Sequence, residues 1–306
     1  MVKTKVTMRD IAKALDVSVA TVSYVLNHSE KEKISHETRI KVMETAKKMG
    51  YVPNLSARSL ASKRSNLIGI IINIGKNASR FKKDRYYDLA MELQQQLSKK
   101  GYDTIVSITE EIRQRDLEIA SKRLLEAVFV IDIDEKYLQE VTCHTYVPVI
   151  FLECILEKEF FYQIVPDYKL VMQRAKTYLE EENLFIIMDD LLNSKAIKIL
   201  TENIASENIL ISRSSREIKE FLKEHQNQKG IIIGETLGME AERYIDNTQF
   251  VVLTEYAEES GLLPTTKRLT ITNKHKAEVA VDIMNQLMNL AYDEQKGTCI
   301  LLQPQM

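Results

Sequence analysis

Between Ser18 and Asn27, the sequence SVATVSYVLN places small and hydrogen-bonding side chains on the outer face of a predicted helix. The inner face is formed by Val22, Val25 and Leu26, and the stretch carries no charge. A helix face that only meets water is usually rich in Lys and Glu. Small residues permit close approach to a DNA groove, and hydroxyl and amide groups bind phosphates and base edges. The residue types therefore indicate a DNA-binding helix, and any three-helix bundle is the alternative with the same apolar pattern.

Three short helices are predicted to position this face. Thr7 is expected to cap the first helix, with Asp10 as the acid of a capping box. Asp16 stands in the following turn, where Asp tolerates a left-handed backbone. Ser18 and Ser35 are expected to cap the second and third helices. The third helix is expected to run through Ile40, Met43 and Ala46. Two helices joined by a tight turn form a helix-turn-helix.

Charge is divided unevenly along the 306 residues. Residues 1–66 hold 13 Lys and Arg against 6 Asp and Glu, whereas the remainder holds 29 against 38. A basic head on an acidic body suggests that the head alone meets a polyanion. The length and the 44% hydrophobic content suffice for two or three packed units.

Two stretches carry a resemblance to a known family: TMRDIAKALDVSVATVSYVLN and ISHETRIKVMETAKKMGYVPNLSARSLASKRSNLIGIII. They resemble the LacI/GalR family of bacterial transcriptional repressors. The resemblance implies a helix-turn-helix headpiece over 1–53, a hinge helix and linker over 54–66, and a two-lobe effector-binding and dimerisation domain over 67–306. In such repressors the hinge becomes helical on the operator and enters the minor groove.

The resemblance also assigns DNA contacts by position. It implies base reading by Val19, Ala20, Tyr24, Ala57 and Leu60. It implies backbone contacts by Ser18, Thr21, Ser23, Asn27, Thr38, Tyr51, Asn54, Arg58 and Lys63. Leu60 would be the apolar wedge in the central base step, where unstacking costs a few kcal/mol; docking of Leu60 on the body is the alternative. Tyr24 departs from the family, in which arginine is frequent there, because tyrosine lacks a bidentate fork for guanine.

From Leu67 onward, short apolar runs such as LIGIIIN, AVFVIDI and GIIIG alternate with amphipathic stretches. This alternation predicts α/β structure with parallel sheets covered on both faces. The number of runs suits two doubly wound lobes in tandem, as in the periplasmic-binding-protein-like sensors of the family. The expected bounds are 67–152 plus 274–300 for lobe 1 and 153–273 for lobe 2. Ligands of such folds bind at the carboxyl ends of the strands.

The expected sensor differs from the family in its polar groups. Asp167-Tyr168, Gly234-Glu235 and Glu255-Tyr256 stand where the family has Asp-Asn, Asn-Asp and Asp-Asp pairs, and a lysine replaces the usual arginine. The effector candidates carried over by position are Tyr86, Tyr87, Asp167, Lys195, Glu235 and Glu255. Three interpretations stay open: a sugar or sugar-phosphate sensor, a sensor for another small ligand, and a ligand-insensitive lobe pair kept for dimerisation.

Other classes of protein find little support in the sequence. There is no GxSxG, GxxxxGK or paired metal motif, and the three cysteines and five histidines are scattered, so we expect no enzyme, metal or cofactor. The N-terminal stretch lacks an apolar signal core and no run is long enough to span a bilayer, which favours a cytoplasmic protein without a membrane partner. We expect a homodimeric repressor of carbohydrate or related metabolic genes on a palindromic operator. A cytoplasmic small-ligand binding protein without operator function is the alternative.

Overall fold

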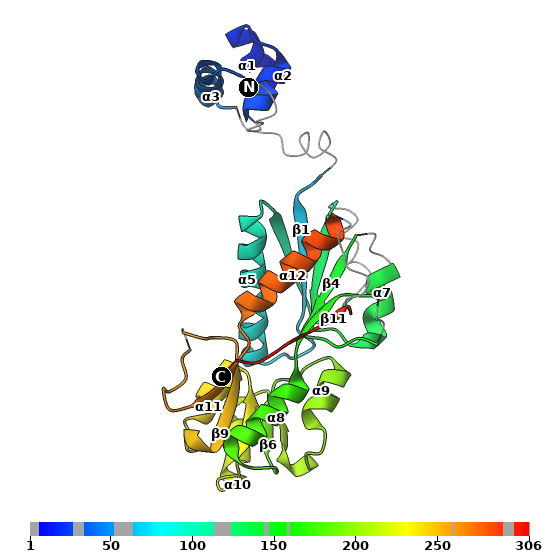
Figure 1. Ribbon diagram of the computed structural model, residues 1–306, viewed down its shortest axis with the longest axis vertical. Coiled ribbons are helices and arrows are strands. Elements are labelled where there is room, and N and C mark those ends of the chain that lie inside the picture. Colours follow the sequence, from blue (N-terminus) through cyan, green and yellow to red (C-terminus); the bar gives the residue numbers. More distant parts are fainter. Residues whose placement is uncertain are drawn as a thin grey trace. The chain divides into compact units, whose positions relative to one another are not determined.

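The computed structural model describes residues 6–26, 34–51, 64–112, 124–143, 147–157, 160–258, 260–289 and 297–305. The chain divides into two compact units, 1–64 and 65–306, which we call the headpiece and the body. Figure 1 labels the headpiece helices and many of the helices and strands of the body. No helix in these ranges is both long and apolar enough to cross a membrane.

Three helices lie in the described part of the headpiece. They are α1 (Met8–Leu15), α2 (Val19–Leu26) and α3 (His36–Met49). Their shared core is small: Ile11, Ala12, Val22, Val25, Val42 and Ala46. The third helix therefore turns Val42 and Ala46 inward, four residues apart, whereas Ile40 and Met43 are each 45% exposed. The helix runs through Ile40, Met43 and Ala46 as expected, and its apolar residues lie on more than one face.

The predicted helix ends are confirmed. Asp10 accepts hydrogen bonds from the backbone N–H of Thr7 at 2.8 Å and from the Thr7 hydroxyl at 2.7 Å. Ser35 accepts from the backbone N–H of Thr38 at 3.2 Å and so caps α3. Asp16 ends α1 in the left-handed region with φ 50°, and Gly50 ends α3 with φ 67°. Such local signals fix the three helix boundaries.

The body contains two parallel sheets, one in each lobe. The lobe 1 sheet has the order β11-β5-β4-β3-β1-β2 and the lobe 2 sheet the order β10-β9-β8-β6-β7. The lobe 1 strands are β1 (Leu67–Asn73), β2 (Asp103–Thr109), β3 (Ala127–Ile131), β4 (Val149–Leu152), β5 (Gln163–Pro166) and β11 (Cys299–Leu302). The lobe 2 strands are β6 (Phe185–Met188), β7 (Ile209–Ile211), β8 (Gly230–Ile233), β9 (Phe250–Thr254) and β10 (Lys267–Thr270). All of these pairings are parallel.

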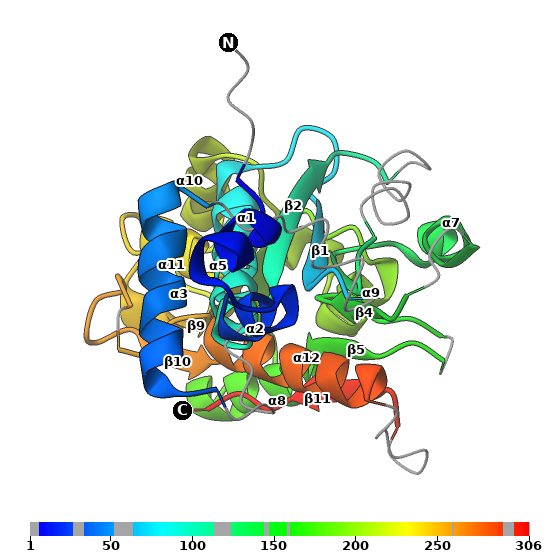
Figure 2. The same cartoon turned by 90° about the horizontal axis from the view of Figure 1, so that it is seen from above.

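Helices cover both faces of each sheet, as the continuous apolar runs predict. In lobe 1, α5 (Arg80–Lys99) and α12 (Asn273–Met288) lie side by side over one face, and α7 (Leu138–Cys143) lies over the other (Figures 1 and 2). In lobe 2, α8 (Tyr168–Leu179) and α9 (Ser194–Thr201) pack together, as do α10 (Ser215–Glu224) and α11 (Glu235–Ala241). Three short 3-10 turns, Glu135–Tyr137, Ser206–Asn208 and Asn247–Gln249, complete the described elements.

The chain passes between the lobes at three places. It leaves lobe 1 after β5 and returns from β10 to α12. After β11, Gln305 forms an antiparallel bridge with Thr270 at the end of β10. Because β5 pairs with β4 and β11, the crossing into lobe 2 follows Pro166 and not the expected region near 153. One apolar core runs through both lobes, from Ile70 to Ile231 and Leu253.

Candidate functional site

In the headpiece, α2 exposes three of the residues to which the family resemblance assigns base reading. Val19 is 42% exposed and Tyr24 is 38% exposed, and Ala20 is also exposed. Val22 and Val25 lie buried on the opposite side of the same helix. The helix carries no acidic residue in its first turn and no basic residue in its last. The outer face of α2 therefore carries no charge and is accessible to a binding partner.

Hydroxyl groups gather at the N-termini of α2 and α3. Ser18 accepts a hydrogen bond from the backbone N–H of Thr21 at 2.9 Å, and the two hydroxyls are 2.8 Å apart. The hydroxyls of Ser35 and Thr38 are likewise 2.8 Å apart. The first N–H groups of a helix and its dipole favour an anion at this end. These capped ends could bind DNA phosphates beside the outer face of α2.

The remaining residues expected to contact DNA are partly buried or lie outside the described ranges. Ser23 is half-buried, and Tyr51 packs against the headpiece core. Six expected residues lie outside the described ranges: Asn27, Asn54, Ala57, Arg58, Leu60 and Lys63. The hinge prediction thus stays a prediction.

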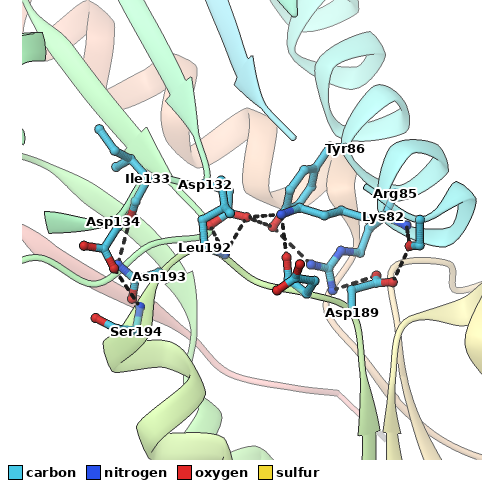
Figure 3. Close-up of polar contacts among 12 residues, drawn as sticks. Lys82, Arg85, Tyr86, Asp132, Ile133, Asp134, Asp189, Leu192, Asn193 and Ser194 are labelled. Atoms are coloured by element: carbon cyan, nitrogen blue, oxygen red, sulfur yellow. Dashed lines mark hydrogen bonds and ion pairs between the residues drawn. The ribbon is translucent and has the colours of Figure 1, made fainter. Parts of the chain in front are cut away.

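The body holds a second candidate site where the carboxyl ends of its two sheets meet. Four buried acids each directly follow a strand: Asp132, Glu153, Asp189 and Glu255. Three buried basic residues come from α5 and α12: Lys82, Arg85 and Lys276. We call the contact region between the lobes the interlobe seam, defined by Ser79, Lys82, Arg85, Asp132, Asp189, Asp190 and Leu192. Figure 3 labels Lys82, Arg85, Asp132, Asp189 and Leu192.

Lys82 and Asp132 form the centre of the seam. The Lys82 ammonium lies 3.0 Å from the Asp132 carboxylate and donates to the backbone carbonyl of Asp190, in lobe 2, at 2.6 Å. Asp132 also accepts from the Tyr86 hydroxyl at 2.9 Å and from the backbone N–H of Leu192 at 3.1 Å. Figure 3 shows these groups converging on one carboxylate. Its acceptor positions are thus used by the protein itself.

Two of the buried acids lie on strained backbone. Asp132 has φ 57° and Glu153 has φ 59°, a region that residues with a Cβ seldom adopt. Each is fixed by a buried cation, since Lys276 lies 2.7 Å from Glu153 as Lys82 does from Asp132. Burial raises the pKa of Asp132, although Lys82 opposes the rise. Burial acts the same way on Glu153, but Lys276 and Arg85 outweigh it and lower the pKa of Glu153.

Arg85 is held more loosely than either lysine. Its side chain is 5% exposed, and its guanidinium lies 4.0 Å from both Asp189 and Glu255, beyond hydrogen-bond distance. It donates one hydrogen bond of 3.2 Å to the Tyr86 hydroxyl, and its Nε has no hydrogen-bond partner. Burial raises the pKa of Asp189 and of Glu255, while the charge of Arg85 works against the rise.

Polar contacts continue along the start of α9. The Asn193 amide donates to the backbone carbonyls of Ile133 and Ile155, each at 3.0 Å. Lys195, of lobe 2, lies 2.9 Å from both Glu135 and Glu157 in lobe 1. The loop from Asp189 to Lys195 is therefore bound to lobe 1 along its length.

The six expected effector residues do not form one pocket. Tyr86 is fully buried in the seam and Glu255 lies beside Arg85. Tyr87 packs half-buried against the core, and Asp167 caps α8 through the backbone N–H of Leu170 at 3.0 Å. Lys195 forms the ion pairs described above. Glu235 binds its own lobe, accepting from the Ser260 hydroxyl at 2.7 Å and from Gly261 N–H at 2.6 Å. As effector contacts, these residues remain predictions.

The central groups of the seam were not predicted from the sequence. Lys82 and Arg85 belong to the run RFKKDRYYD, which has the composition of a solvated face. One signal was available, since Asp132 and Asp189 directly follow apolar runs and so must lie at the carboxyl edges of the sheets. In the described part of the chain, no group of three or more His, Cys, Asp or Glu is placed to hold a metal ion.

Comparisons with known proteins agree with this architecture. Residues 7–54, which include α1 to α3, match the family described as bacterial regulatory proteins, lacI family. Catabolite control protein A of Staphylococcus epidermidis is 30% identical over 181 residues, which are 58% of this chain and 53% of that protein. The protein of the same name from Priestia megaterium is 31% identical over 169 residues, 54% of this chain and 48% of that one. Over residues 7–54 the chain is similar to the lacI family.

The fold of the chain has counterparts among solved structures. The lac repressor dimer bound to operator and the anti-inducer ONPF has a TM-score of 0.75 at 18% identity, over 98% of this chain and 97% of that one. This likeness concerns the fold. The chain spans about half the length of the curated relatives it matches.

Proposed function

We propose that this chain is a sequence-specific DNA-binding transcriptional regulator, a repressor of carbohydrate or related metabolic genes. The observation that carries the proposal is the exposed, uncharged outer face of α2 within the segment that matches the lacI family. Val19 and Ala20 are small enough to permit entry into a major groove, and Tyr24 offers a hydroxyl and a ring to base edges. The capped ends of α2 and α3 would hold the DNA backbone.

The proposal includes a homodimer on a palindromic operator. One headpiece exposes three residues on α2 for base reading, which are too few contacts to specify a unique DNA site. Two-fold pairing doubles the contacts and matches a two-fold symmetric DNA sequence. Sedimentation of the full chain with and without DNA tests this assembly directly.

Selection of binding sites from random duplex DNA tests the operator-binding function. We expect the wild-type chain to enrich a palindrome. Tyr24→Arg should enrich guanine at one symmetric position of each half-site, because arginine binds guanine with two hydrogen bonds, worth about 1–3 kcal/mol of discrimination. Lys48→Arg introduces the same side chain, an arginine, on the exposed side of α3. It is the matched control and should leave the selected sequence unchanged. A wild-type chain that enriches no sequence would refute the proposal.

The hinge contributes to the proposal through the family resemblance. Leu60→Ala should lower operator affinity while dimerisation is kept, because the wedge at the central base step would be lost. Binding measured by gel shift on the selected palindrome gives the affinity. Equal affinity of Leu60→Ala and wild type would remove the wedge from the proposal.

For the body, the seam favours the ligand-insensitive alternative over a carbohydrate sensor. A sugar needs several free hydrogen-bond donors and acceptors in the cleft, whereas Asp132 already accepts from Lys82, Tyr86 and Leu192. Among the seam residues, Arg85 keeps an unbonded Nε donor. Thermal unfolding with sugars, sugar phosphates and nucleosides tests this preference. A ligand at about 100 times its Kd would add about 2.7 kcal/mol of stability and raise the Tm. We expect no such rise, and a clear rise with one compound would restore the sensor function.

A further inference from the structure

Lys82 is buried between the lobes and contacts Asp132 of lobe 1 and Asp190 of lobe 2. We propose that its ammonium group acts as a built-in ligand, which keeps the two lobes closed without any small molecule. The inference deepens the ligand-insensitive form of the proposed function and rests on it for any consequence for DNA binding. Its structural basis lies wholly within the body.

The groups around the Lys82 ammonium form a site for a primary ammonium ion. They are a carboxylate oxygen of Asp132 at 3.0 Å, the carbonyl oxygen of Asp190 at 2.6 Å, and the ring of Tyr86 with its centroid at 5.5 Å. An ammonium group offers three N–H donors and is attracted to the face of an aromatic ring. Since Asp132 belongs to lobe 1 and Asp190 to lobe 2, a single ammonium bridges the lobes.

Burial makes this site depend on its cation. Lys82 and Asp132 are both 0% exposed. A lysine is almost never fully buried unless it is paired, and a buried carboxylate without its countercharge is strongly destabilising. The acceptor from lobe 2 reaches Lys82 only while the lobes are closed. Removal of the ammonium should therefore favour an open arrangement in which water reaches Asp132.

Asp132 connects the ammonium to the backbone of lobe 2. Its two carboxylate oxygens each lie 3.1 Å from the Leu192 nitrogen, and one of them also accepts from Lys82. The φ of 57° that aims this side chain into the seam is a strained conformation, which persists where surrounding contacts fix it. Loss of Lys82 would thus weaken the anchor of the Leu192 amide.

Apolar contacts close the seam beside the ion pair. Phe81, the residue before Lys82, packs against the lobe 2 core around Phe185 and Ile232. Leu192 packs closely against Gly75, since a Cβ added to Gly75 would lie 2.8 Å from the Cδ2 atom of Leu192. These contacts also join the two lobes, and the Lys82 side chain is enclosed between them.

Chemical rescue of Lys82→Ala tests the inference in the full chain. The substitution removes Cγ, Cδ, Cε and Nζ, which together correspond to n-propylammonium. Amide hydrogen exchange of the loop 189–195, read at Leu192, reports closure because this N–H donates to Asp132 only across the seam. We expect exchange there to accelerate at least tenfold and the Tm to fall by about 5–15 °C. Millimolar n-propylammonium chloride should reverse both effects, whereas 1-propanol and sodium chloride should not.

Lys195→Ala is the matched control, because Lys195 also joins the lobes but lies 28% exposed with Glu135 and Glu157. Its exchange at Leu192 should change less than twofold and should not respond to the amine. Unchanged exchange and Tm in Lys82→Ala would overturn the inference, and so would an equal effect of n-propylammonium on all three proteins.

If Lys82→Ala does not fold, Lys82→Met keeps most of the side-chain volume and removes only the charge. Faster exchange at Leu192 in Lys82→Met supports the inference, and wild-type exchange overturns it. All of these measurements are made without DNA. Failure of the wild-type chain to select a DNA sequence would therefore refute the proposed function without affecting the inference about Lys82. Unchanged exchange and Tm in the Lys82 variants would overturn that inference without affecting the proposed DNA binding.

Discussion

Ser79 donates a hydrogen bond to Asp189 from one lobe to the other, with 3.1 Å between the hydroxyl and carboxylate oxygens. The same hydroxyl accepts from the backbone N–H of Lys82 at 3.0 Å and so caps α5. One side chain thus fixes the start of the helix that carries Lys82 and the acid that follows β6. The position of Lys82 in the seam depends on both bonds.

Ser79→Ala should destabilise the full chain by about 1–3 kcal/mol, because a helix cap and one bond to a buried carboxylate are lost together. Ser214→Ala removes a cap of α10 alone, where Ser214 accepts from Glu217 N–H. This control should cost about 1 kcal/mol or less. Urea unfolding of both variants gives the comparison, and equal losses would show that the bond to Asp189 contributes nothing.

The pH dependence of stability should differ in sign for two buried acids. Burial raises the pKa of Asp189 above its ordinary value, so the folded chain binds more protons there than the unfolded chain. This carboxyl then lowers the free energy of unfolding as the pH rises through its folded pKa. Asp189→Asn removes that contribution. Relative to wild type, the stability of Asp189→Asn should increase as the pH rises above about 4, the ordinary pKa of an aspartate, measured by urea unfolding at each pH.

Glu153 should behave in the opposite way. Although burial raises its pKa, Lys276 and Arg85 lower it overall, so the ionised form stabilises the folded chain. That contribution is complete above the unfolded value of about 4.3 and is lost as the pH falls through the lower folded value. The deficit of Glu153→Gln should therefore be constant above about pH 5 and shrink below about pH 4. Parallel curves for the two variants would contradict both assignments.

Gly50→Ala should destabilise the headpiece through backbone conformation alone. Gly50 has φ 67°, and a Cβ built there meets no atom within 4 Å. A left-handed residue with a Cβ costs about 1–2 kcal/mol. Thermal unfolding of the full chain, followed by far-ultraviolet circular dichroism, should show the first transition at a lower temperature. Asp16→Gly, at φ 50°, provides the reverse substitution and should raise it.

Gly230→Ala should destabilise lobe 2 by overpacking. A Cβ at Gly230 would lie 2.3 Å from two ring atoms of Phe185, which is itself fully buried. Such overpacking costs about 1–3 kcal/mol. Gly297→Ala is the control, because a Cβ there has nothing within 4 Å. Calorimetry of both variants checks the difference, and similar Tm values would mean that Phe185 can move aside.

The strands that could be predicted from sequence are those whose residues form apolar runs, although the edge strands β2 and β7 stay partly exposed. Eight continuous apolar runs became β1 to β4 and β6 to β9. Two strands escaped prediction because their sequences are not continuously apolar. The short β5 reads QIVP and ends in proline, and β10 reads KRLT, with burial confined mainly to Leu269. Their assignment depends on neighbouring strands, which local periodicity does not contain.

The headpiece surface was predictable because its signals are local, whereas the seam was not. Ser18, Thr21 and Tyr24 lie within one short helix and its cap. Lys82 meets Asp132 and Asp190 only after the body has folded, since its partners follow 50 and 108 residues later. A lysine in a charged run gives no sign that it will be fully buried. The polar groups of the seam therefore follow from tertiary structure.

The place of β11 in the sheet has a consequence for biosynthesis. β11 pairs with β5, and α12 packs against α5, so lobe 1 takes its last strand and a covering helix from residues beyond 272. Lobe 2 is built from one uninterrupted segment, from α8 to β10. Because a nascent chain leaves the ribosome from its N-terminus, the later-encoded lobe has all its strands available first. Until α12 emerges, α5 of lobe 1 lacks its covering helix. During this interval lobe 1 exposes an apolar surface to which a chaperone would bind.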